Sequence, residues 1–265
     1  RTETPPHFLL GLVLGFLLGL ISGGTLFAFA LPMLQGVGVD PAIAPDAARV
    51  VRVMALGYPF QLLLVAATFF LEGVSRPKRV MVVDVAILPI NGVLAWILAT
   101  GQFGLPAMGA VGAAAATVTA TLIGAVAMIV AALTLPRAHE RGVRDWRDFG
   151  SPAMWRGVWA LLGFGFVPAI ASGLELAGFS ILIALSTQLA ETVTHAFQIV
   201  FSVHNVTFAF ALGLGSAAGV RAGNAVGEGS PAEAGPRTAI AAALAALTLG
   251  LLALPLILVP QLIVG

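Results

Sequence analysis

The sequence predicts an all-α membrane protein, a polytopic bundle of about seven transmembrane helices. Its 265 residues are 59% hydrophobic and only 9% charged, and their mean hydropathy is +1.01. A soluble domain carries about a quarter charged residues. Apolar segments that exceed the ~20 residues needed to cross the hydrocarbon recur seven times. The basic residues gather in alternate gaps between these segments, as they do when a chain crosses a membrane repeatedly.

The apolar segments are spaced along the whole chain. They cover residues 8–35, 47–74, 80–101, 106–135, 155–185, 193–222 and 238–262. Pro and Gly interrupt several of them, which membrane helices tolerate when neighbours satisfy the freed backbone groups. No ten-residue segments alternate in polarity, as the strands of a membrane barrel would. We therefore expect helices throughout.

The positions of Lys and Arg predict the orientation of the chain. The gaps between spans are assigned in turn to the two sides of the membrane. Eleven of the thirteen basic residues then fall on one side, and only Arg49 and Arg52 fall on the other. Basic residues favour the cytoplasmic side. We therefore expect a multi-pass protein of the plasma membrane, whose first span enters from the cytoplasm and whose seventh span leaves toward the outside.

One loop divides the predicted spans into two groups. Residues 137–152 form the longest and most charged gap, with four spans before it and three after it. We interpret 1–136 as an N-terminal lobe, 137–152 as a cytoplasmic linker between lobes, and 153–265 as a C-terminal lobe. The chain begins at Arg1, with no signal peptide before the first apolar run. We expect a piece of a longer protein.

The composition excludes several classes of function. A net charge of +1 without a basic stripe gives no surface for nucleic acid. The absence of Cys removes disulfides, thiol catalysis and thiolate metal sites. Because Lys78 is the only lysine and lies in a predicted loop, a retinal-binding receptor is disfavoured. We expect no enzyme, because no nucleophile and base share adjacent turns and no His-Glu-x-x-His run is present. No metal site is expected, since His195 and His204 lack a third ligand.

Two predicted helices carry glycine at every fourth position. The first holds Gly11, Gly15, Gly19 and Gly23, and the sixth holds Gly215, Gly219, Gly223 and Gly227. Glycines at this spacing form a flat stripe that lets another helix backbone approach closely. The stripes indicate either plain helix packing or a surface that slides during a conformational change.

The strongest candidate for function is Glu175, which lies within the apolar run 155–185. An acid inside a bilayer costs several kcal/mol unless it is protonated, paired or facing water. A carboxyl group in a low-dielectric cavity favours its neutral form, so such a group can hold a proton, bind Na⁺ or neutralise a cationic substrate. The structural alternative is a protonated Glu175 bonded to a neighbouring backbone.

Polar residues in neighbouring spans are further candidates for lining a cavity. Gln198 and Asn205 are seven residues apart and share one helical face, and His195 lies on the same helix. Hydrogen bonding between helices is the alternative for all three. Asn91, two residues after Pro89, either bonds backbone freed by that proline or joins the cavity.

Several motifs, in order along the chain, resemble the multidrug and toxic compound extrusion (MATE) transporters. The runs FLEGVSRPK at 70–78 and GQFGLPAMGAVGAA at 101–114 are similar to the family's turns after its fourth and fifth helices. Glu175 with Phe179 resembles the acidic pattern of the family's seventh helix. AFQI at 196–199 is similar to the start of its eighth helix, and RAGNAVGEG at 221–229 to the end of that helix.

This resemblance implies helices three to nine of a twelve-helix transporter built from two pseudo-repeated six-helix lobes. The chain would hold the last four helices of the first lobe and the first three of the second. The remaining helices of the full-length transporter would be its partners, together with the lipid bilayer. The family exports organic cations and drugs in exchange for Na⁺ or H⁺ by alternating access, with no further cofactor.

A flippase for lipid-linked oligosaccharides, from the same superfamily, is the alternative that the resemblance leaves open. Such a protein uses basic residues in its cavity to hold a pyrophosphate. No Lys or Arg lies deep in a predicted span, which favours the drug exporter.

Overall fold

Seven long helices make up the part of this chain that the structure describes. The structure, a computed structural model, describes residues 7–36, 38–136, 149–186 and 191–258. The helices are α1 (His7–Gly36), α2 (Ala44–Gly73), α3 (Pro77–Thr100), α4 (Gly109–Leu133), α5 (Pro152–Ser186), α6 (Glu191–Gly227) and α7 (Ala234–Leu258). A short 3₁₀ helix, η1 (Pro231–Glu233), precedes α7. Over the described residues no strand occurs, so the predicted all-α class is confirmed.

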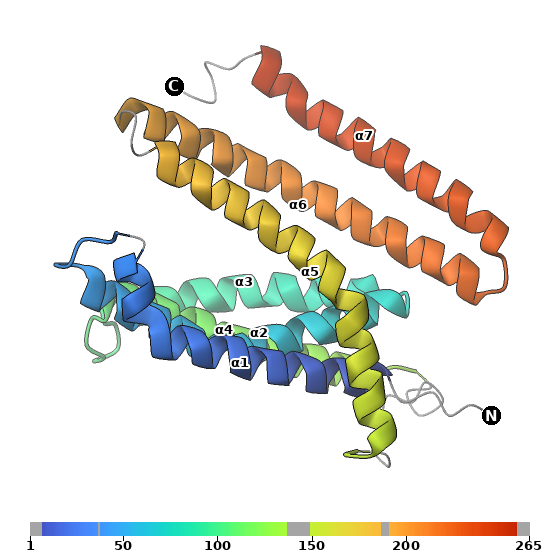
Figure 1. Cartoon of the computed structure of the whole chain (residues 1–265), viewed down its shortest axis with the longest axis horizontal. Helices are drawn as coiled ribbons and strands as arrows, with labels where there is room; N and C mark the ends of the chain where they lie inside the picture. The colour runs from blue at the N-terminus through green and yellow to red at the C-terminus, as the bar shows by residue number, and fades with distance from the viewer. Residues whose placement is uncertain (1–6, 37, 137–148, 187–190, 259–265) are drawn as a thin grey trace. The chain divides into compact units, whose positions relative to one another are not determined.

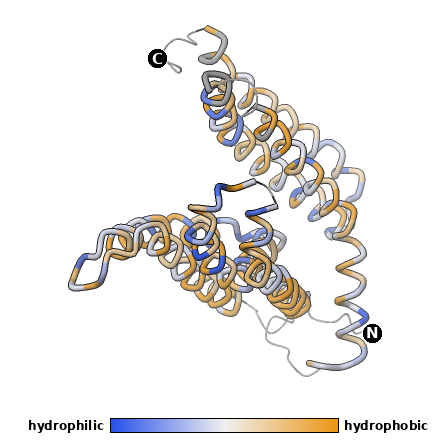
Figure 2. Tube along the Cα trace, turned by 60° about the vertical axis from the view of Figure 1, so that its left-hand side comes forward, coloured by the Kyte–Doolittle hydropathy of each residue, from blue (hydrophilic) through white to orange (hydrophobic). Residues whose placement is uncertain are grey.

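Each of the seven helices is long and apolar enough to cross a membrane, within the part of the chain that is described. Apolar residues recur along the helices of both units (Figure 2). Many large apolar side chains are also exposed, among them Leu88 on α3 and Leu174 on α5. Exposed apolar surface on this scale belongs against lipid rather than water. The predicted multi-pass membrane class is therefore confirmed.

Two compact units divide the chain, Arg1–Phe164 and Gly165–Gly265. The first contains α1 to α4 and about the first third of α5, and the second contains the rest of α5 with α6 and α7. The boundary falls inside α5, after the predicted linker at 137–152. Residues 137–148 of that linker lie outside the described residues.

Helices of the first unit run in alternating directions. α1 packs along α2, and α4 packs against both α2 and α3 (Figure 1). One core cluster joins Phe8 near the start of α1, Leu71 near the end of α2, Val80 near the start of α3 and Ala132 near the end of α4. Because starts and ends of successive helices meet in one cluster, the chain crosses this unit up and down. The charge pattern predicts the same alternation.

Local sequence signals set several helix boundaries in this unit. α2 and α3 have proline in their first turns, where no intrahelical N–H bond is lost. Asp46 adds a negative charge to the first turn of α2, which the helix dipole favours. Gly101 caps the C-terminus of α3, because its φ of 75° is left-handed and its N–H donates to the carbonyl of Ile97. Glycine adopts that conformation without a steric penalty.

The glycine stripe of α1 lies directly against α2. A Cβ at Gly19 would come within 2.5 Å of Pro59 Cα, and one at Gly23 within 2.5 Å of the Ala55 carbonyl oxygen. Hence the prediction of close backbone approach is confirmed for α1. The α6 stripe differs, because no described atom lies within 4 Å of a Cβ built at Gly215, Gly219, Gly223 or Gly227. For α6 the packing role stays a prediction.

Arg79, in the first turn of α3, binds the last turn of α4. Its guanidinium donates to the Ala131 carbonyl at 2.6 Å, to Thr134 Oγ1 at 3.0 Å and to the Thr134 carbonyl at 3.4 Å. Carbonyls at a helix C-terminus lack intrahelical donors, and a positive charge there is favoured by the helix dipole. Arg79 thus joins the neighbouring ends of α3 and α4.

Replacing Arg79 with Gln is expected to lower the free energy of unfolding by about 1 kcal/mol, because charge-assisted hydrogen bonds are lost from a partly exposed site. Thermal unfolding of the full-length protein in detergent would measure the loss. Lys78→Gln is the matched control, since Lys78 is an exposed neighbour with the same charge. Equal midpoints for the two variants would contradict the role of Arg79.

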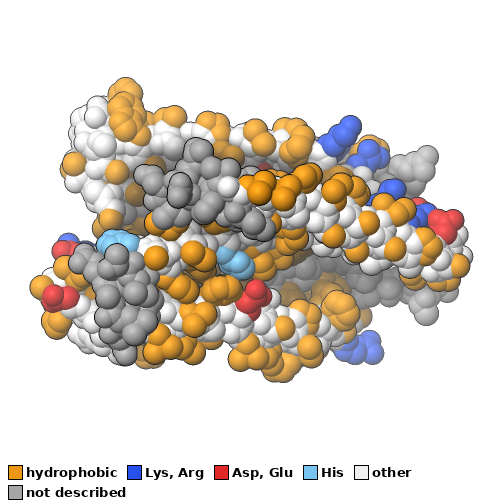
Figure 3. Space-filling view, turned by 90° about the horizontal axis from the view of Figure 1, so that it is seen from above, with side chains coloured by type: hydrophobic (Ala, Val, Ile, Leu, Met, Phe, Trp, Pro, Cys, Tyr) orange, Lys and Arg blue, Asp and Glu red, His pale blue; other side chains and the backbone are white. Residues whose placement is uncertain are grey.

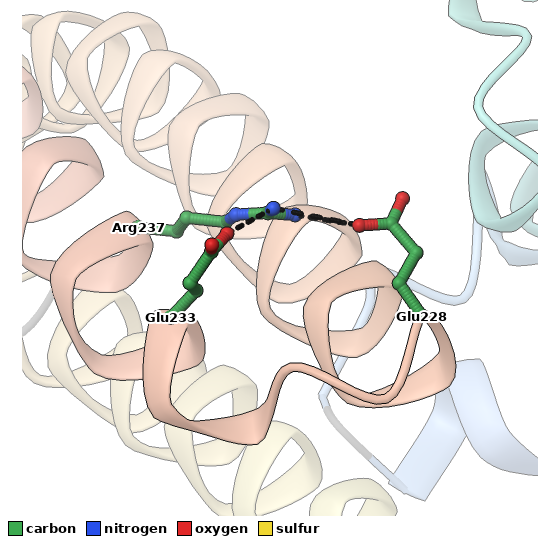
Figure 4. Close-up of polar contacts among 3 residues, drawn as sticks. All are labelled: Glu228, Glu233 and Arg237. Atoms are coloured by element: carbon green, nitrogen blue, oxygen red, sulfur yellow. Dashed lines mark hydrogen bonds and ion pairs between the residues drawn. The ribbon is translucent and has the colours of Figure 1, made fainter.

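In the second unit α6 and α7 pack side by side and are joined through η1. An ion-pair cluster forms at this turn (Figure 4). The guanidinium of Arg237 lies between two carboxylates, 2.5 Å from Glu233 and 3.4 Å from Glu228. Both acids are largely exposed, and pairs of this kind contribute little to stability in water. The cluster therefore orders the turn more than it stabilises the fold.

Candidate functional site

Glu175 lies in a pocket between α5 and α6, within the second unit. The pocket has a volume of about 180 Å³. From α5 it is lined by Ser172, Glu175, Leu176 and Phe179, and from α6 by Phe201, His204, Asn205, Phe208 and Leu212. The α5 residues recur at helical spacing, so a single face of that helix forms one wall.

Aromatic rings form the opposite wall and bridge the two helices. On α6, Phe197, Phe201, His204 and Phe208 are spaced by four, three and four residues, and neighbouring rings are stacked with centroids 5.7–6.4 Å apart. Phe179 of α5 meets this column, with ring centroids 5.4 Å from Phe201 and 4.8 Å from His204. Such distances are typical of attractive aromatic pairs. The two helices thus meet here through large rings.

Glu175 is the one acidic side chain that lines the pocket. None of the lining residues is Lys or Arg. In Figure 3, acidic and histidine side chains are seen among hydrophobic ones. A carboxylate beside aromatic faces attracts cations, since both present negative potential.

Asn205 adds a polar group at the edge of this pocket. Its Nδ2 donates to the Phe201 carbonyl at 3.0 Å, one turn earlier on the same helix. The hydroxyl groups of Ser202 and Thr207 also donate hydrogen bonds within α6, to the carbonyls of Gln198 and His204 respectively. Hence these side chains satisfy their donors locally, and Glu175 is the strongest polar feature of the pocket.

The structure brings together some of the predicted site residues and separates others. Glu175 and Asn205 line the same pocket, whereas Gln198 and His195 lie on α6 but not among its lining residues. Asn91 belongs to the first unit, where Thr117 Oγ1 of α4 lies 3.5 Å from its Oδ1. That contact is between α3 and α4 and is long for a hydrogen bond.

Sequence reasoning did not select the phenylalanines of the aromatic column as part of the site. Its signal was nevertheless present, because residues 197, 201, 204 and 208 follow the period of one helical face. In a chain with 16 phenylalanines the signal is weak, since packing and lipid contact use the same residues. No group of three or more metal-ligating side chains occurs in the ranges that the structure describes.

Fold and sequence together define a multi-pass membrane protein with an acid-bearing pocket in its second unit. The model of one family, described as MatE, matches residues 3–97 and 168–265. The chain therefore belongs to the MatE family, whose members are transporters and not enzymes.

Relatives with curated names cover nearly the whole chain. A "Probable multidrug resistance protein NorM" from Burkholderia mallei is 30% identical over 264 residues, covering 98% of this chain and 54% of that protein. The "Multidrug resistance protein NorM" of Vibrio cholerae is 28% identical over 219 residues, covering 82% and 47%. The chain thus spans about half the length of the relatives it matches.

A solved structure shares the fold. The crystal structure of the eukaryotic MATE transporter AtDTX14 superposes with a TM-score of 0.72 at 22% sequence identity, covering 93% of this chain and 52% of that one. The predicted family and helical fold are confirmed by these matches.

Proposed function

We propose that this chain is part of a secondary transporter that exports organic cations and drugs in exchange for Na⁺ or H⁺. One observation carries the proposal: a carboxylate, Glu175, stands in an aromatic pocket between apolar helices, with no basic side chain among its lining residues. Relatives named as multidrug resistance proteins support the drug substrate class. The lobes at 1–136 and 153–265, joined by a linker at 137–152, would rock to alternate access.

Glu175 would serve both partners of the exchange. A cationic drug neutralises the carboxylate and stacks on the aromatic wall, and an entering Na⁺ or H⁺ neutralises the same group. Because the two events compete for one charge, cation entry releases the drug. Asn205 would add a polar contact at this site. Gln198, His195 and Asn91 would line the transport path at other depths.

The pocket disfavours the flippase alternative. A lipid-linked pyrophosphate carries several negative charges and would be repelled by Glu175. Lys and Arg, which bind such groups, are missing from its lining residues. We place the full-length protein in the bacterial cytoplasmic membrane, with its basic loops inside.

Dye efflux tests this function directly. The complete gene is expressed in cells lacking their own efflux pumps, and ethidium efflux is followed after a Na⁺ jump or a pH jump. Faster efflux than in cells with the empty vector is expected after one of the two jumps, which identifies the coupling ion. Efflux equal to the vector control under both would overturn the proposal.

Truncating the aromatic wall is expected to weaken substrate binding without removing transport. Phe179→Ala should raise the ethidium concentration for half-maximal efflux by about 2- to 30-fold, as expected from cation–π contributions of about 0.5–2 kcal/mol. Phe166→Ala is the matched control, because Phe166 lies on α5, is 61% exposed and does not line the pocket. The same shift in both variants would argue against the aromatic wall as a binding surface.

A further inference from the structure

An apolar groove, separate from the Glu175 pocket, lies in the first unit between α1 and the start of α5. It has a volume of about 410 Å³. α1 supplies Leu9, Val13, Phe16 and Leu17 to its lining, and the start of α5 supplies Met154 and Trp155. Its walls carry almost no polar atoms, so a ligand for it must be a hydrocarbon.

The groove is held in place by a small core of its own. Leu10 of α1 packs with Met154 and Val158 of α5, and all three are buried. Met154 and Val158 are four residues apart, so one face of α5 covers the beginning of α1, where the two helices cross (Figure 1). The groove beside this contact is therefore part of the packed fold.

Its length matches one leaflet of a bilayer. The groove follows α1 from Leu9 to Leu17, and eight residues of helix span about 12 Å. Half of the hydrocarbon thickness is about 15 Å. With α1 entering from the cytoplasm, as the charge pattern predicts, the groove would run from the inner membrane surface almost to the midplane.

The side chains at the predicted cytoplasmic end of the groove are of the kinds that contact a lipid headgroup. Trp155 is 43% exposed, and Trp is typical of the membrane–water interface. The next residue, Arg156, is exposed as well. Arg76 and Lys78 are exposed at the same end of the unit, because the core cluster there joins the starts of α1 and α3. This end is basic, as a site for an anionic headgroup requires.

We propose that this groove binds an acyl chain of an anionic phospholipid from the cytoplasmic leaflet, with Arg156 facing its phosphate. The hydrocarbon walls hold the chain, and the basic rim selects the headgroup. This proposal is independent of the transport function, because it uses a different unit and none of the residues around Glu175.

Quenching of tryptophan fluorescence by brominated lipid tests the proposal on the full-length protein in nanodiscs. Trp155 is kept as the single reporter by changing every other Trp to Phe. Dibromostearoyl phosphatidylglycerol is compared with dibromostearoyl phosphatidylcholine. Half-maximal quenching is expected at about fivefold lower mole fraction of the anionic lipid, the preference given by one basic side chain near a headgroup. Arg156→Gln should abolish this difference.

A second reporter gives the matched control. Trp159 lies one turn further along α5, is exposed and does not line the groove, so as the single reporter it should be quenched equally by both lipids. Equal quenching of Trp155 by both lipids would overturn the proposal. Absence of quenching at Trp155 would overturn it too, and would show that another segment of the full-length protein fills the groove.

Discussion

Glu175→Gln is expected to reduce ethidium efflux by about 10- to 100-fold in the full-length protein. The substitution keeps the size of the side chain but removes the charge that both the drug and the coupling ion must neutralise. Charge-assisted contacts contribute about 1.5–3 kcal/mol, which corresponds to this range of affinity. The measurement is initial efflux rate against dye concentration, at saturating Na⁺ or pH gradient in pump-deficient cells.

Two further variants separate this effect from a loss of folded protein. Glu228→Gln makes the same chemical change at the exposed α6–α7 turn, outside the pocket, and should leave efflux near the wild-type rate. Glu175→Asp keeps the charge and should restore part of the transport. Full efflux by Glu175→Gln at every pH would remove Glu175 from the coupling mechanism.

Adding one methyl group at Gly19 is expected to destabilise the protein by about 1–3 kcal/mol, the usual cost of overpacking. The new Cβ would lie 2.5 Å from Pro59 Cα and 2.9 Å from both Pro59 N and the Tyr58 carbonyl oxygen. These are backbone atoms, so relief requires α1 and α2 to move apart. Thermal unfolding of Gly19→Ala in detergent would measure the loss.

Gly24→Ala controls for the change in helix propensity. Gly24 belongs to α1 as well, but no described atom lies within 4 Å of its Cβ position. Alanine there should leave stability unchanged or raise it by up to about 1 kcal/mol, because alanine favours helix more than glycine does. If both alanine variants unfold at the wild-type temperature, the close approach of α1 and α2 contributes nothing to stability.

The candidate site was only partly predictable. Glu175 was evident because an acid in an apolar span is rare and costly. Gln198 and Asn205 looked equivalent, because seven residues return to the same helical face. They nevertheless differ by about 10 Å along α6, and only Asn205 lies at the level of Glu175. Spacing gives the face of a helix but not the height at which a neighbouring helix meets it.

The glycine stripes make the same distinction. Both stripes have the spacing of a packing surface. Among the described residues, however, only the α1 stripe is in close contact with the backbone of another helix, α2. A stripe permits close approach through the absence of side chains. Which helix fills that space depends on the order and tilt of the bundle, and these are set by contacts far apart in the sequence.

The sequence by itself determined that this chain is helical, that it holds seven segments long enough to cross a membrane, and that Glu175 lies within one of them. These properties follow from hydropathy, length and charge, which act on each segment separately. The tertiary structure alone decided that Glu175 faces an aromatic column on α6 and that α1 and α5 enclose an apolar groove. Both features depend on which faces of two helices meet, and that is a property of their packing together.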